Sequence, residues 1–202
     1  MEKSSEEELR TSIPVAKSRL KRNIDSAWEL IKFAAIALAI VVPIRMFIAQ
    51  PFVVSGESMV PTFQDGQYLI VDEISYITVG PHRGDVVVFK YPNDPSRYFI
   101  KRIIGLPNET VEIKGDVVKI INAENPKGFI LEEEYVNEKF SATGTHKVGA
   151  DEYFVMGDNR NRSSDSRIWG MLPRKLMVGR AYLRLLPIKD VAYLPGAKEE
   201  PK

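Results

Sequence analysis

The distribution of charged and apolar residues divides the chain into a polar beginning, one apolar segment and a long remainder of short runs. From residue 28 to residue 54 the charged residues are Glu29, Lys32 and Arg45, and none lies between Lys32 and Arg45. An uncharged run of this length fits a membrane span, a buried core helix or the apolar part of a cleavable signal peptide.

The charges that flank this segment favour a retained membrane anchor over the other two interpretations. Long cationic side chains near the ends of a span, such as Lys32 and Arg45, can reach the polar interface. Shortly before the segment come Lys17, Arg19, Lys21 and Arg22. No Lys or Arg lies between Arg45 and Arg83, so the positive-inside rule places the N-terminus in the cytoplasm. We therefore expect a cytoplasmic segment over 1–27 and a single transmembrane helix over 28–50.

From residue 51 to residue 194 the pattern predicts a mainly β, antiparallel domain. We expect this domain on the extracytoplasmic side of the cell membrane. Short runs rich in β-branched and aromatic residues alternate with turn residues, as in strands. The runs that predict strands are 68–71, 85–89, 98–104, 111–113, 117–120, 152–156 and 180–186. No amphipathic helix longer than two turns is expected after residue 60. Residues 122–146 predict a small insertion, and 195–202 a flexible tail.

The composition narrows the chemistry without identifying it. The 202 residues carry a net charge of +1, which gives no basic field for nucleic acid. The absence of cysteine excludes a thiol nucleophile and disulfides. The two histidines, His82 and His146, lack neighbours at the spacing of metal ligands. We expect no metal and no cofactor.

Two segments in this domain are candidates for nucleophilic chemistry. Ser58 lies in a loop rich in glycine and proline, where a hydroxyl can face a cleft, although an isolated turn of this kind is usually only a turn. Lys101 shares a strand face with Phe99 and Ile103. An ammonium group in apolar surroundings loses hydration, which lowers its pKa and lets the neutral amine act as a base. A surface lysine on an edge strand is the alternative, and Arg102 stays protonated and cannot be the base.

A third segment is dense in hydrogen-bonding groups. It runs from Gly157 to Arg167 with the sequence Gly-Asp-Asn-Arg-Asn-Arg-Ser-Ser-Asp-Ser-Arg. Such a run is either a solvated loop or a buried network of paired aspartates and arginines.

Together the three segments resemble the bacterial type I signal peptidases over residues 28–190. The resemblance rests on Ser-Met-x-Pro-Thr at Ser58, the Lys-Arg strand that ends in Gly-Leu-Pro, and the Gly-Asp-Asn-Arg run, in this order after an N-terminal anchor. It implies a membrane-bound serine endopeptidase with Ser58 as nucleophile and Lys101 as general base. It also implies that Ser163 orients the lysine amine. The supporting network that it implies consists of Asp158, Arg160, Asp165 and Arg167.

The resemblance further implies cleavage of translocated preproteins after small residues, at the membrane surface. The substrate-binding pockets are expected from Phe52, Val54, Met59, Phe63 and Ile100. The implied partners are signal peptides and the lipid bilayer, and a monomer is expected. Family members that carry a hydroxyl two residues before the nucleophile use it as a second oxyanion donor. This chain has Gly56 there, which leaves Ser55, a water or no second donor.

Two other functions remain as alternatives. Self-cleaving repressors of the SOS response also use a serine and a lysine, but residues 1–27 are too few for their DNA-binding domain. A membrane-tethered binding module without activity would not depend on Ser58. The sequence leaves open the set of preproteins and any sister enzyme.

Overall fold

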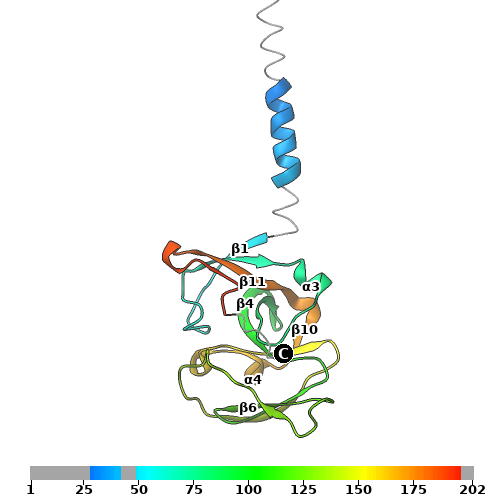
Figure 1. The fold of residues 1–202 in the computed structure, drawn as a ribbon, viewed down its shortest axis with the longest axis vertical. Coiled ribbons are helices and arrows are strands. Elements are labelled where there is room, and N and C mark those ends of the chain that lie inside the picture. Colours follow the sequence, from blue (N-terminus) through cyan, green and yellow to red (C-terminus); the bar gives the residue numbers. More distant parts are fainter. Residues whose placement is uncertain (1–27, 42–48, 197–202) are drawn as a thin grey trace, which may run out of the picture. The chain divides into compact units, whose positions relative to one another are not determined.

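The structure is a computed structural model that describes residues 28–41 and 49–196, and the chain forms two compact units. The unit up to Met46 contains a helix over residues 28–41, and the unit from Phe47 onward contains two β-sheets (Figure 1). Within the described ranges, no helix is both long enough and apolar enough to span a membrane.

The expected N-terminal segments are only partly described. The segment 1–27 and residues 42–48 of the expected transmembrane helix lie outside the described residues. At residues 49–50 the structure differs from the expected boundary. Ala49 and Gln50 begin strand β1 and pair with Asp72 and Val71 of strand β2. Their backbone groups belong to a sheet ladder, so the helix cannot extend to residue 50.

The larger sheet of the second unit has eight strands in the described part of the chain, in the order β1-β2-β11-β3-β4-β9-β10, with β12 beside β11. Its strands are β1 (Ala49–Val53), β2 (Tyr68–Asp72), β3 (Val86–Tyr91), β4 (Asp94–Gly105), β9 (Glu152–Met156), β10 (Leu172–Pro173), β11 (Met177–Leu186) and β12 (Ala192–Tyr193). Each of its pairings is antiparallel. The mainly β, antiparallel fold expected from the sequence is therefore confirmed.

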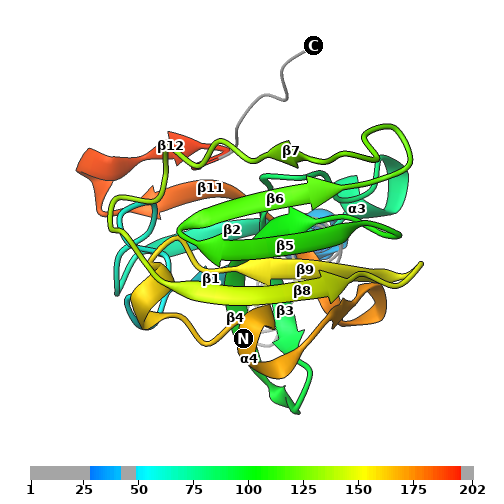
Figure 2. The ribbon, with the colours of Figure 1, turned by 90° about the horizontal axis from the view of Figure 1, so that it is seen from below.

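A smaller sheet of four strands lies against β9 and the end of β4, and Figure 2 shows it from its outer side. Its order is β7-β6-β5-β8, with β5 (Thr110–Gly115), β6 (Val117–Ile121), β7 (Phe129–Ile130) and β8 (Ala142–Lys147). The segment 122–146, expected as an insertion, thus supplies β7 and most of β8 to this sheet.

The helices of the described part beyond residue 60 are single turns. They are α3 (Ser75–Thr78), α4 (Ser166–Trp169), and the 3-10 turns η1 (Arg160–Arg162), η2 (Arg174–Leu176) and η3 (Ile188–Asp190). The tail expected from residue 195 is described as far as Gly196. The carbonyl of Gly196 accepts a hydrogen bond from the buried guanidinium of Arg102, so the chain is fixed to this point.

Strand β4 is buried on both faces at its C-terminal end, and this burial creates the site. Ile103 packs in one hydrophobic cluster with Val87 and Phe89, whereas Ile104 packs in another with Val111 and Phe154. Because alternate residues of a strand share a face, Lys101 lies on the face of Ile103 and Arg102 on the face of Ile104. The cationic side chains of Lys101 and Arg102 therefore enter the interior on opposite faces of β4, in different surroundings.

Candidate active site

Lys101 and Ser58 meet at one point of the molecule. The Lys101 side chain is buried, with 4% of the residue's surface exposed. Its Nζ donates hydrogen bonds to Ser58 Oγ at 2.7 Å and to the Ile100 carbonyl at 2.8 Å. Ser58 and Lys101 are 43 positions apart in the sequence, and the fold brings their two motifs together.

The surroundings of Lys101 change its acidity. Burial lowers the pKa of Lys101 from 10.5 to about 8, although the carboxylates of Asp165 and Asp158 favour the charged form. The described hydrogen-bond partners of its Nζ are neutral oxygens, so no carboxylate pairs directly with the ammonium. An amine with such a pKa is partly neutral at physiological pH, and the neutral form can accept the proton of the hydroxyl 2.7 Å away.

The loop that carries Ser58 is held from both sides. The Ser58 carbonyl accepts a hydrogen bond from the Asn159 N–H at 3.0 Å. Before Ser58, the Gly56 N–H donates to Asp65 Oδ1 at 2.7 Å. Gly56 has a φ of 90°, a conformation that favours glycine. The position of the hydroxyl thus depends on the Gly-Asp-Asn segment as well as on its own loop.

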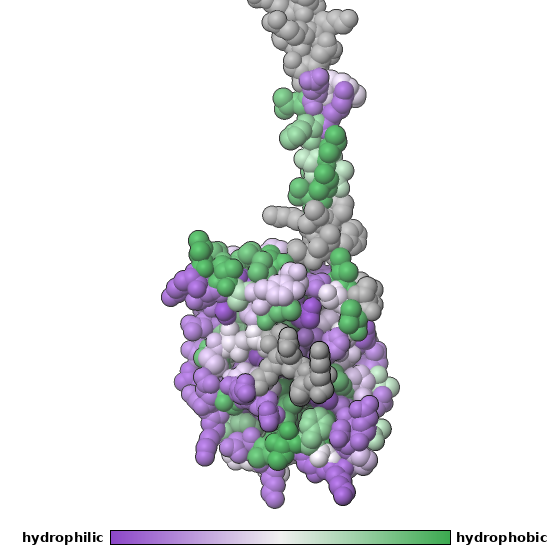
Figure 3. Space-filling model, in the orientation of Figure 1, coloured by the Kyte–Doolittle hydropathy of each residue, from purple (hydrophilic) through white to green (hydrophobic). Residues whose placement is uncertain are grey.

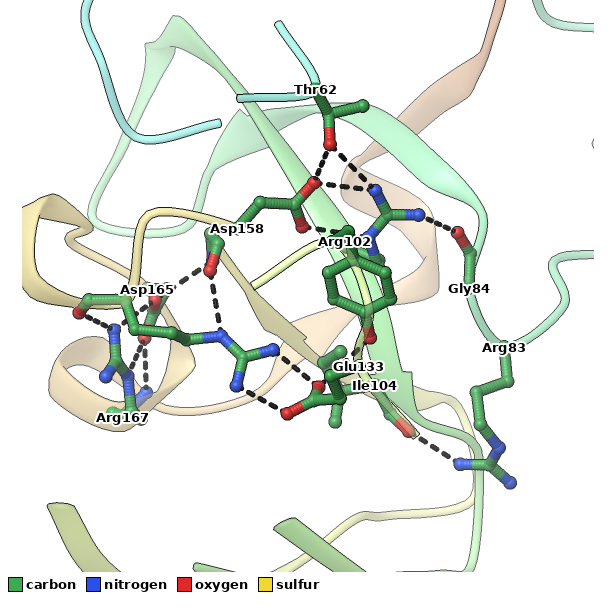
Figure 4. A network of polar contacts seen from close by, with 12 residues as sticks. Thr62, Arg83, Gly84, Arg102, Ile104, Glu133, Asp158, Asp165 and Arg167 are labelled. Atoms are coloured by element: carbon green, nitrogen blue, oxygen red, sulfur yellow. Dashed lines mark hydrogen bonds and ion pairs between the residues drawn. The ribbon is translucent and has the colours of Figure 1, made fainter. Parts of the chain in front are cut away.

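Arg102 is the centre of a buried network on the opposite face of β4 (Figure 4). Its Nε and Nη2 donate to the two carboxylate oxygens of Asp158, at 2.8 and 2.6 Å, and both side chains are fully buried. Its Nη1 donates to the carbonyls of Gly84, at 2.7 Å, and Gly196. Thr62 Oγ1, four residues after Ser58, donates to Asp158 at 2.5 Å. The network therefore ties the serine loop to β4.

The rest of the Gly-Asp-Asn-Arg segment is also a buried network rather than a solvated loop. Asp165 accepts hydrogen bonds from the Gly157 N–H at 3.1 Å and from Arg167 Nε at 2.8 Å. Arg160 donates to the Gly157 carbonyl and forms a two-bond ion pair with Glu133. Asp158, Arg160, Asp165 and Arg167 thus lie together, and they touch the site through the backbone of the segment 157–159. Their supporting role stays a prediction.

Ser163 lies where the segment passes the serine loop, but it makes no bond to Lys101. Its Oγ is buried and has no hydrogen-bond partner within the part of the chain that the structure describes. A Cβ added at Gly157 would lie 2.3 Å from Ser163 Oγ and 2.4 Å from the Ser58 carbonyl oxygen. Only a glycine fits between these two groups. The orienting role of Ser163 stays a prediction.

A cleft of about 480 Å³ opens above Ser58 and Lys101. Three of the residues expected in the substrate pockets, Phe52, Val54 and Ile100, line it. The structure places the other two elsewhere. Met59 and Phe63 are fully buried in the core cluster beneath the loop, because the turns after Ser58 direct both side chains inward.

The sequence did not single out several residues that build the site. Arg102 was considered only as an unsuitable base, and Glu133 and Tyr135 lie in the segment expected as an insertion. The Arg102 guanidinium lies 3.9 Å from the centre of the Tyr135 ring. The alternation along β4 could have marked Arg102, since it lies between two isoleucines. Nothing local distinguishes Glu133 from its acidic neighbours.

In the described residues, no three His, Cys, Asp or Glu side chains converge as metal ligands.

Comparisons with known proteins identify the family. The family model of signal peptidase, peptidase S26, matches residues 27–186, and the chain belongs to this family. The chain is 39% identical to signal peptidase I of Leptolyngbya laminosa over 175 residues, which cover 82% of this chain and 83% of that protein. It is 38% identical to probable signal peptidase I-2 of Synechocystis sp. (strain PCC 6803), over 87% of this chain and 81% of that protein.

Among solved structures, the crystal structure of a signal peptidase I from Enterococcus faecalis V583 is 33% identical. The match covers 50% of this chain and 95% of that one, with a TM-score of 0.43. Membership of the family makes this chain a peptidase of the signal peptidase type.

Proposed function

We propose that this chain is a membrane-bound serine endopeptidase that removes N-terminal signal peptides from translocated preproteins. One observation carries the proposal. The Nζ of a buried lysine, whose pKa is lowered to about 8, lies 2.7 Å from the Oγ of Ser58 on the wall of a cleft.

The chemistry proceeds through an acyl-enzyme. The neutral amine of Lys101 takes the proton of Ser58 as Oγ attacks the scissile carbonyl carbon. The resulting ammonium then gives that proton to the leaving amine, and the ester at Ser58 remains. The same amine then takes a proton from a water that attacks the ester. The bond between the acyl carbon and Ser58 Oγ breaks, the Lys101 ammonium gives that proton to Oγ, and the second product leaves as the acid.

The oxyanion of each tetrahedral intermediate needs hydrogen-bond donors. The backbone N–H of Ser58 is the first, because it donates no hydrogen bond within the described residues. The Gly56 N–H already donates a hydrogen bond to Asp65, and glycine has no side-chain hydroxyl that could donate to the oxyanion instead. The second donor therefore stays open between Ser55, a water and none.

The cleft suits an extended peptide with small side chains. The walls that strands supply to the cleft are mainly apolar. They consist of Phe52 and Val53 of β1, Val54 directly after it, and Tyr98–Ile100 of β4. An extended substrate can add to such strands through its backbone. We infer that the residues before the cut bind here, and that shallow apolar pockets select small residues, as in the small-x-small sites expected from the family resemblance.

An exposed apolar surface supports association with a bilayer. Val53, Tyr68 and Leu186 lie opposite one another on β1, β2 and β11, so their side chains share a face. All three are at least 40% exposed. The β11–β12 hairpin adds further exposed apolar residues, Leu185, Ile188, Val191 and Tyr193. Figure 3 shows apolar side chains gathered over this hairpin, which Figure 1 colours red. Such a patch marks an interaction site.

The proposed topology has the N-terminus in the cytoplasm, an anchor that begins at residue 28, and the β domain outside. It places the cleft at the outer membrane surface, where a translocated signal peptide ends.

The test is cleavage of a secretory preprotein by the full chain in detergent or lipid. The native chain is compared with Ser58→Ala and Lys101→Ala, and with Lys119→Ala, which changes a half-buried lysine of the small sheet. We expect a cut after a small-x-small sequence, retained in Lys119→Ala and abolished in the other two variants with folding intact. Cleavage by Ser58→Ala would support a different site, and no cleavage by the native chain would support the binding module.

A further inference from the structure

One ion pair stands on the wall of the cleft itself. Arg162 Nη1 donates to Glu57 Oε2, and the two side chains are 70% and 57% exposed. Both residues line the cleft together with Ser58 and Lys101. Glu57 directly precedes Ser58, and Arg162 directly precedes Ser163, so the pair joins the two loops that meet at the nucleophile.

This pair is not what holds the loops together. The Asn159–Ser58 backbone bond and the hydrogen bond from Thr62 to Asp158 already join them. A solvent-exposed ion pair contributes little to stability. Because both partners face the cleft, however, each of them is accessible to a bound peptide.

The other charged residues that line the cleft all belong to the basic type. Apart from Glu57, its charged lining residues are Arg97, Lys101 and Arg162, all cationic. The strands supply the apolar lining together with Arg97 and Lys101 of β4, whereas the loops supply Glu57, Arg162 and Ser164. If residues before the cut occupy the apolar part, the segment after the cut leaves along the loops. This step rests on the proposed function.

We propose that Arg162 is a specificity-determining residue that binds an acidic side chain on the first residues after the cut. In the free protein the Glu57 carboxylate occupies the place of that acidic side chain, which shows that a carboxylate can reach the guanidinium there. Arginine offers five N–H donors in a planar fork, and Glu57 engages Nη1. A substrate carboxylate displaces Glu57, and a substrate lysine meets the cationic lining unpaired.

The experiment uses three peptides that are identical up to the cut and carry Asp, Asn or Lys at the two positions after it. The full chain in detergent cleaves each, and kcat/KM is measured at low and high salt. For the native chain we expect the Asp peptide to exceed the Lys peptide by about two- to five-fold, the range of exposed charge pairs. The preference should shrink near 1 M salt, where the screening length falls to about 3 Å.

Variants separate recognition from structure. Arg162→Gln should bring the ratio of Asp to Lys cleavage towards one, and Arg162→Glu should invert it. Glu57→Gln should raise the ratio, because the competing carboxylate is gone. Lys119→Ala, at a half-buried pair remote in sequence from the cleft loops, should leave the ratio as in the native chain.

An unchanged ratio in both Arg162 variants would overturn this inference while the cleavage itself upholds the proposed function. The same would follow if these variants lowered kcat/KM equally for the three peptides, since that is the signature of a structural role. If the native chain cuts none of them, the proposed function falls, and this inference falls with it.

Discussion

Replacing the buried lysine by a methionine tests whether its ammonium is held in the interior at a cost in stability. Lys101→Met keeps an unbranched side chain of similar length in contact with Phe99, whose ring centre lies 5.4 Å from Nζ. It removes the charge and the hydrogen bonds to Ser58 and Ile100. We expect an inactive protein whose stability relative to the native chain depends on pH.

The magnitude follows from the lowered pKa. The difference between 10.5 and a pKa of about 8 for Lys101, at roughly 1.4 kcal/mol for each pKa unit, corresponds to about 3 kcal/mol. Below about pH 8 the lysine is protonated in both folded and unfolded chains, and the folded state bears this penalty in full. Between about pH 8 and 10.5 the folded state releases the proton first, so the penalty declines as pH rises.

Loss of two hydrogen bonds, at about 1 kcal/mol each, opposes the gain. Lys101→Met should therefore be more stable than the native chain by about 1 kcal/mol at pH 7. Between pH 7 and pH 10 this advantage should fall by about 2 to 3 kcal/mol and change sign.

The assay is guanidinium unfolding of the full chain in mild detergent, followed by tryptophan fluorescence at both pH values. Titration of all other groups is common to the two proteins and cancels in the difference. A difference in the free energy of unfolding that does not change with pH would refute a buried lysine with a lowered pKa.

Two further substitutions test the packing around the site. Gly157→Ala should lower kcat/KM about 100-fold, which is the cost of displacing a reacting group by about 1 Å. The reason is that the added Cβ cannot fit between the Ser58 carbonyl and Ser163. Native activity of this variant would contradict the close approach of these groups. Asp158→Asn should lower the free energy of unfolding by about 3 to 5 kcal/mol, since it leaves the Arg102 charge buried without its counter-ion; denaturant melts that coincide with the native chain would contradict the network.

Matched controls exist for both substitutions. At Gly149 an added Cβ would meet the flexible side chain of Glu152 rather than backbone, so Gly149→Ala should retain activity. Glu112→Gln removes the solvent-accessible pair with Lys119, whose atoms lie 3.8 Å apart, and should change the free energy of unfolding by at most about 1 kcal/mol.

The sequence predicted the strands better than the boundaries between segments. Runs such as 85–89 and 152–156 consist of residues that fit a pleated, buried surface, and the structure has strands there. The start of β1 was missed because Ala49 and Gln50 continue an uncharged stretch. Hydropathy alone does not show where a helix ends and an apolar strand begins.

The site was predictable where its chemistry depends on local motifs. Ser58 and Lys101 stand in recognisable runs, and the structure brings them together. Arg102 was not predictable as a hub, because its partners Thr62, Gly84 and Asp158 come from three separate segments. Proximity to Ser58 in sequence was also misleading, since Met59 adjoins Ser58 yet lies in the core.

The most direct test of the central claim is the pH dependence of kcat/KM for a cleavable preprotein, which reports the free enzyme's essential base. If neutral Lys101 activates Ser58, kcat/KM should rise with pH and level off with an apparent pKa of about 8, and Lys101→Arg should be inactive at every pH. A flat profile from mildly acidic to alkaline pH, or substantial cleavage by Lys101→Arg, would contradict the claim.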